Sequence, residues 1–99
     1  MKTGSRDAKV HMLISDDELI ELQRHTYLMA EAFGLDSRIE RYKGKRPIGL
    51  WRWDMDCLID VVSIALDNRT EYPSRESSAW LALRNLHARL KEEYDKAFV

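Results

Sequence analysis

The sequence predicts an all-α protein, a small three- to four-helix bundle around a largely buried central helix at about residues 50–67. The polar side chains of this segment stand four, four, three and four residues apart, which places them on one line of a helix: Arg52, Asp56, Asp60, Ser63 and Asp67. Almost every other side chain there is apolar, so only a narrow edge should meet water. Two further stretches repeat apolar residues at steps of three and four, and both predict helices that pack against it.

Residues 1–14 are expected to form a partly flexible N-terminal arm, because residues 1–9 are polar and show no periodicity. The apolar run at 10–14 fits either an extended segment lying on the bundle or an edge strand. A strand needs a partner, and the rest of the sequence offers none, so such a strand would pair between two copies. Residues 15–99 are expected to form a single helical domain.

The first helix is expected at about residues 16–33. Ser15 followed by Glu18 has the spacing of a capping box, and Gly34 is a natural C-terminal stop. A short second helix is expected at 37–42, before a loop rich in glycine, proline and basic residues.

The β-branched residues of the central segment would also suit a buried strand, but the segment exceeds the roughly ten residues at which strands usually stop. The last helix is expected at about 75–97, with Ser74 or Ser77 as its cap. Its apolar side chains recur with heptad-like spacing, which favours helix–helix packing.

The basic, aromatic stretch at residues 38–52 is the clearest indication of a binding function. It holds six bases and one acid, although the whole chain has a net charge of only −1. Interleaved cationic and aromatic side chains suit phosphate contact with base stacking. They equally suit an acidic protein partner, since Arg, Trp and Tyr dominate interface hot spots. The candidate binding surface consists of Arg41, Lys43, Lys45, Arg46, Trp51, Arg52 and Trp53.

A plain solvated loop is the structural alternative, with Trp51 and Trp53 simply capping the core. On a helix these two side chains are about 200° apart. They are therefore not expected to face the same way, and one of them should be exposed.

We expect a non-catalytic protein that acts through protein–protein contact, as a homodimer. Three sides of the central helix need covering, and a chain of 99 residues offers little apolar surface for this. The single Cys57 and the absence of an apolar leader in the sequence favour the cytoplasm. No run of apolar residues approaches the roughly 20 needed to span a bilayer. A nucleic-acid-associated accessory protein that uses the basic stretch is the first alternative.

A metal-dependent hydrolase is the second alternative. Glu18 and Glu21 have a Glu-x-x-Glu spacing that resembles the all-α nucleotide pyrophosphohydrolases. The second helix of that family carries Glu-x-x-Asp, whereas this chain has Asp56-x-x-x-Asp60. A solvated stripe explains these aspartates without a metal. His25 stands alone, and His87 is interpreted as a boundary histidine packed beside aromatic residues. No cofactor, metal site or catalytic residue is therefore expected.

Overall fold

The structure, a computed structural model, describes residues 9–29 and 34–98. Over these residues the chain is mostly helical, with a small two-stranded sheet. The elements are β1 (Val10–Met12), α1 (Asp16–Gln23), the 3-10 helix η2 (Thr26–Met29), α2 (Leu35–Arg41), β2 (Ile48–Leu50), α3 (Arg52–Leu66) and α4 (Ser78–Phe98). The broad prediction of a compact helical fold is confirmed, whereas the prediction of an all-α chain misses the sheet.

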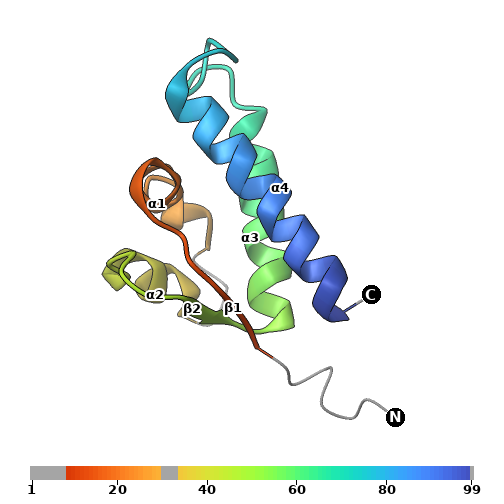
Figure 1. Cartoon of the computed structure of the whole chain (residues 1–99). Coiled ribbons are helices and arrows are strands. Elements are labelled where there is room, and N and C mark those ends of the chain that lie inside the picture. Colours follow the sequence, from red (N-terminus) through yellow and green to blue (C-terminus); the bar gives the residue numbers. More distant parts are fainter. Residues whose placement is uncertain (1–8, 30–33, 99) are drawn as a thin grey trace.

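Helix α3 is the centre of the fold, as its apolar pattern predicts. α4 runs antiparallel along it, and η2 and β2 pack against other parts of it (Figure 1). Its inward side chains are at most 4% exposed: Met55, Leu58, Val61, Val62 and Ala65. The predicted polar line is exposed from Arg52 to Asp67. Because elements of one copy cover the buried faces of α3, the packing reason for expecting a homodimer does not hold.

The sheet corrects the prediction that the chain offers no partner for a strand near residue 10. β1 pairs antiparallel with β2, and His11 lies opposite Gly49. The glycine therefore belongs to a strand and not to the preceding loop. Val10 and Met12 are buried, as is Ile14 after them, so this part of the predicted arm is built into the fold. Residues 1–8 of that arm lie outside the described residues.

The predicted first helix is shorter than expected, because α1 ends at Gln23. Thr26 lies at the break, and its hydroxyl has two acceptors within reach of its one hydrogen: the Gln23 carbonyl at 3.3 Å and Glu40 Oε2 at 3.1 Å. Side-chain bonds of this kind compete with the helical ladder. Ser15 occupies the N-cap position of α1 but makes no side-chain cap bond, so the predicted capping box is wrong. Residues 30–33 lie outside the described residues, and Gly34 (φ +87°) caps the start of α2.

Helix α4 starts at Ser78, and the alternative cap Ser77 accepts a hydrogen bond from the Trp80 backbone N–H at 3.2 Å. The Trp80 indole N–H donates to the Leu66 carbonyl at 3.1 Å, at the C-terminal end of α3. This bond satisfies one of the carbonyls that a helix end leaves open. Trp80 thus links the start of α4 to the C-terminal end of α3.

Candidate functional site

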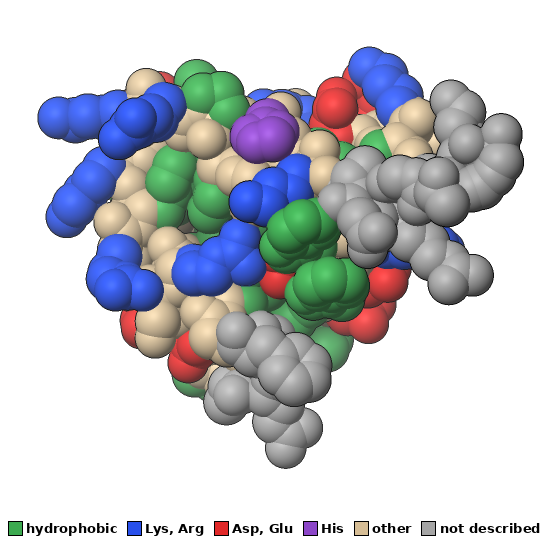
Figure 2. All heavy atoms as spheres, turned by 90° about the horizontal axis from the view of Figure 1, so that it is seen from below, with side chains coloured by type: hydrophobic (Ala, Val, Ile, Leu, Met, Phe, Trp, Pro, Cys, Tyr) green, Lys and Arg blue, Asp and Glu red, His purple; other side chains and the backbone are tan. Residues whose placement is uncertain are grey.

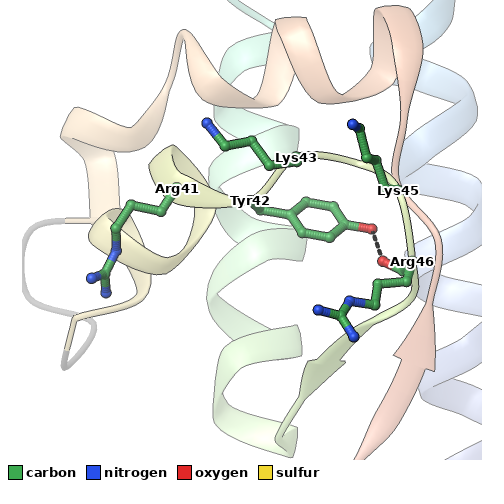
Figure 3. Close-up of a pocket in the computed structure, with 5 residues that line it drawn as sticks. All are labelled: Arg41, Tyr42, Lys43, Lys45 and Arg46. Atoms are coloured by element: carbon green, nitrogen blue, oxygen red, sulfur yellow. Dashed lines mark hydrogen bonds between the residues drawn. The ribbon is translucent and has the colours of Figure 1, made fainter.

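Residues 41–46 surround a hollow of about 300 Å³ after α2, lined by Arg41, Tyr42, Lys43, Lys45 and Arg46. The Tyr42 ring lies at its centre, and the Tyr42 hydroxyl donates to the Arg46 carbonyl at 2.6 Å. Figure 3 shows Lys43 and Lys45 on one side of the ring and Arg46 on the other, whereas Arg41 points away. The lining side chains include four cations and no acid. The hollow therefore favours an anionic ligand.

The loop around this hollow is held in a defined shape. The Gln23 side-chain amide donates to the Ile39 carbonyl at 3.0 Å and to the Tyr42 carbonyl at 3.1 Å, which ties the end of α2 to α1. Gly44 has φ +72°, and a Cβ there would lie 3.0 Å from Leu19 and 3.1 Å from the carbonyl oxygen of Ile14. Only glycine adopts this positive φ without strain and has no Cβ to clash with these neighbours. The cations of the loop are thus presented on a fixed backbone.

These loop cations are available to a partner. Among the described residues, Arg41, Lys43, Lys45 and Arg46 form no ion pair. Glu40 is the one acid of the basic stretch, and its carboxylate accepts from Thr26 in η2. The positive charge of the loop is therefore not neutralised by described side chains of the fold.

Two cations of the basic stretch have internal roles instead. The guanidinium of Arg38 lies 2.9 Å from Asp54 Oδ2 and donates to the Gly49 carbonyl at 2.6 Å, so it joins α2, β2 and α3. Asp54 is 2% exposed and also accepts from the Trp51 backbone N–H at 3.0 Å. Arg52 Nε donates to the Tyr94 hydroxyl at 3.0 Å, and its guanidinium lies 5.7 Å from the Tyr94 ring centroid. Arg52, a predicted surface residue, is therefore tied to α4.

Trp51 and Trp53 face the same way, which corrects the expectation that they point apart. Trp51 is the N-cap of α3 and has extended backbone angles (φ −76°, ψ 170°), so helical spacing does not apply to it. The two rings stack with centroids 5.6 Å apart and planes 17° apart. Lys9 Nζ lies 5.0 Å from the Trp51 centroid, a cation–π contact. Trp53 is 53% exposed, so the pair presents a large aromatic surface to a partner.

The loop hollow and the tryptophan pair are joined by β2, and together they form what we call the basic–aromatic surface: Arg41, Tyr42, Lys43, Lys45, Arg46, Trp51 and Trp53. In Figure 2, Lys and Arg side chains gather mainly on the left of the face that carries the strands and the start of α3. Exposed hydrophobic side chains lie at the centre of the same face, and Asp and Glu side chains border them.

Sequence reasoning missed a buried polar cluster that joins α1 to the connection before α4. Glu21, His25 and Tyr72 are at most 6% exposed. The Tyr72 hydroxyl donates to Glu21 Oε1 at 2.6 Å, so its oxygen accepts the bond from His25 Nε2 at 2.7 Å. Arg24 contacts Glu21 at 3.2 Å and also pairs with Glu71. The partners lie 47 and 51 residues apart, a separation that no local pattern reveals.

This cluster keeps His25 neutral. Burial lowers the pKa of His25, the neighbouring Arg24 cation lowers that pKa further, and the Glu21 carboxylate opposes both effects. His25 Nδ1 has no hydrogen-bond partner among the described residues, so a proton there would be a buried, unsatisfied donor. Burial, and then the hydrogen bond to Glu21, raises the pKa of Tyr72. The cluster therefore acts as a structural clamp between α1 and Tyr72.

Stability is expected to fall as the pH drops below about 6.5, the ordinary pKa of histidine. The unfolded chain then binds a proton at His25 that the folded chain excludes, so unfolding takes up protons and acid favours it. Urea unfolding at a series of pH values from about 5 to about 7.5 checks this, within the window in which histidine titrates. His25→Gln should reduce the pH dependence, whereas His11→Gln, at an exposed position, should leave it intact. An unchanged dependence in His25→Gln would contradict the assignment.

The acidic residues of the hydrolase alternative have other partners. Glu18 pairs with Arg89 and accepts from Asn85 at 2.5 Å, both on α4, and Glu21 belongs to the buried cluster. Asp56 and Asp60 are exposed on α3. Within residues 9–29 and 34–98, no three Asp, Glu, His or Cys side chains come together as a metal site would require. This arrangement gives the hydrolase alternative no support.

Comparison with protein-family models, curated proteins and solved structures yields no match to this chain. In the part of the chain that the structure describes, no helix is both long enough and apolar enough to cross a membrane.

Proposed function

We propose that the protein is a non-catalytic binding protein that acts by contact with an acidic protein surface, through its basic–aromatic surface. The observation that carries this proposal is the hollow at residues 41–46, which four cations and no acid line. Strand β2 connects this loop to a stacked tryptophan pair, of which Trp53 is half exposed. Trp, Tyr and Arg are the residues that most often dominate protein interfaces. Charge in the hollow would steer the partner, and the tryptophans would supply buried area.

Nucleic acid fits this surface less well than protein does. Arg38 and Arg52, two of the six cations of the basic stretch, are engaged with Asp54 and Tyr94. Asp56 is exposed one helical turn beyond Trp53, so a polyphosphate stacked on the tryptophans would meet a like charge there. A protein partner avoids this conflict, because it can place a neutral or basic residue opposite Asp56.

The finer parts of the proposal concern compartment and assembly. The chain has one cysteine, Cys57, which forms no disulfide within the chain and suits a reducing compartment such as the cytoplasm. We also propose a homodimer. The support for it is the distribution of surface charge and not an uncovered side of α3.

Binding of a fluorescent decaglutamate peptide tests the charge requirement. The peptide should bind the wild-type protein and bind more weakly as salt is added. The triple variant Lys43→Ala/Lys45→Ala/Arg46→Ala should weaken binding by at least about tenfold, as expected for about 1.4 kcal/mol of lost interaction. The matched control Arg69→Ala/Lys91→Ala removes exposed cations elsewhere and should bind as the wild type does. Fluorescence anisotropy measures each affinity.

A single-stranded DNA decamer of mixed sequence serves as the competing ligand. Tighter binding of this decamer than of decaglutamate, with loss in the same triple variant, would replace the proposal by the nucleic-acid alternative. Failure of the wild-type protein to bind either probe would contradict a role for the hollow in anion recognition.

A further inference from the structure

We infer that one partner of the basic–aromatic surface is a second copy of this chain, bound across a two-fold axis that passes near the tryptophan pair. This inference rests on the proposed function and names its partner. A two-fold interface brings the same patch of both copies together, so the patch must complement itself. The charges on either side of Trp51 and Trp53 have this property.

Opposite charges flank the tryptophan pair along the chain. On one side, β2 leads back to Arg46 and Lys45, and Arg46 is at most about 17 Å from Trp51 for five extended residues. On the other side, α3 carries the exposed carboxylates of Asp56 and Asp60, with Asp60 about 10 Å beyond Trp53 at the rise of an α-helix. Along the chain, the order is therefore basic, aromatic, acidic.

A two-fold rotation about the aromatic centre reverses this order in the second copy. The basic loop of each copy then faces the aspartates of the other, and the two tryptophan pairs meet at the axis. In Figure 2, Lys and Arg side chains lie mainly to the left of the central hydrophobic patch, and Asp and Glu side chains also border this patch. Each dimer would gain two equivalent sets of opposite charges and an apolar centre, which is the usual anatomy of an interface.

A uniformly acidic partner would fit less of the same surface. Covering the tryptophan pair would bring its acidic groups against Asp56 and Asp60, which are exposed next to Trp53. Like charges brought together across an interface disfavour binding. A second copy removes this conflict because it carries both signs in the complementary order.

Sedimentation velocity of the full chain over about a hundredfold range of concentration tests the inference, because a dimer must dissociate on dilution. The wild type should shift from monomer to dimer, and added salt should oppose the shift. Lys43→Glu/Lys45→Glu should weaken association by at least about tenfold, and Asp56→Lys/Asp60→Lys should do the same. An equimolar mixture of these two variants should restore a dimer, because both sets of facing charges are again opposite in sign in the mixed pair. Arg69→Glu/Lys91→Glu, reversed outside the patch, should associate as the wild type does.

Trp53→Ala provides a second test that leaves the charges unchanged. It should weaken association by about tenfold, since an aromatic contact at the axis is used twice. Because Trp53 is 53% exposed, the variant should stay folded, and circular dichroism checks this directly.

Three results would overturn the inference: a wild-type protein that is monomeric throughout, association that both charge-reversed variants retain, or a mixture of them that stays monomeric. Binding of decaglutamate to a strictly monomeric wild type would overturn the dimer alone and leave the proposed function standing. A wild-type protein that neither binds decaglutamate nor associates would overturn both the dimer and the proposed function.

Discussion

Val62→Asp should prevent folding at 25 °C or leave a loosely packed chain. Val62 is 1% exposed in the middle of α3, where α4, η2 and β2 cover the helix. The substitution removes a buried apolar side chain worth about 2 kcal/mol and introduces a carboxylate without a described partner. An uncompensated buried charge costs about 3–5 kcal/mol more. The combined loss of at least about 5 kcal/mol equals the whole stability of a marginal small domain, since such domains are stable by about 5–15 kcal/mol. Far-UV circular dichroism and a urea titration measure this.

Ile64→Asp is the matched control, because it introduces the same charge two residues further along the same helix. Ile64 is 57% exposed, so its carboxylate would stay in water. The expected change in the free energy of unfolding is within about 1 kcal/mol. A Val62→Asp protein as stable as this control would show that the buried face of α3 is misassigned.

Arg38→Met should lower the free energy of unfolding by about 3 kcal/mol, because breaking a buried ion pair leaves an uncompensated charge. Asp54 is 2% exposed, and without the Arg38 guanidinium its carboxylate keeps only the Trp51 N–H as a described partner. The Gly49 carbonyl of β2 also loses its donor. The urea midpoint, followed by circular dichroism, gives the size of the effect.

Arg41→Met, on the same helix three residues later, removes an exposed charge and should change stability little. The double variant Arg38→Met/Asp54→Leu should recover part of the loss, since removing both charges is less costly than removing one. A single Arg38→Met variant with wild-type stability would contradict a structural role for the Arg38–Asp54 pair.

The parts of the fold that sequence predicts well are those decided by local periodicity. The polar line from Arg52 to Asp67 follows from steps of three and four, and it is exposed in the structure. Partners far apart in sequence were not predictable in this way. The pairing of His11 with Gly49 and the bond between His25 and Tyr72 depend on packing over 38 or more residues, about which short-range spacing carries no information.

The candidate binding surface was likewise predictable only where it depends on residues close together in the sequence. The run of charges and aromatic residues identified the loop, and four of its cations do line one hollow. Sequence spacing could not show that Arg52 is bound to Tyr94, because that contact spans 42 residues. The orientation predicted for Trp51 is also wrong. Trp51 is the N-cap of α3 and has extended backbone angles, so the angular spacing of helical residues does not apply to it.

Nuclear magnetic resonance of the wild-type protein, at a concentration at which sedimentation shows a monomer, during titration with decaglutamate tests the central claim most directly. We predict that the backbone amides of residues 43–46 and the indole N–H of Trp53 shift together and saturate at the same peptide concentration. The hollow on α4 lined by Leu81, Arg84, Asn85 and Ala88 should show no such shifts. Shifts confined to that α4 face, or no shifts at saturating peptide, would contradict the assignment of residues 41–46 and the tryptophan pair as a protein-binding surface.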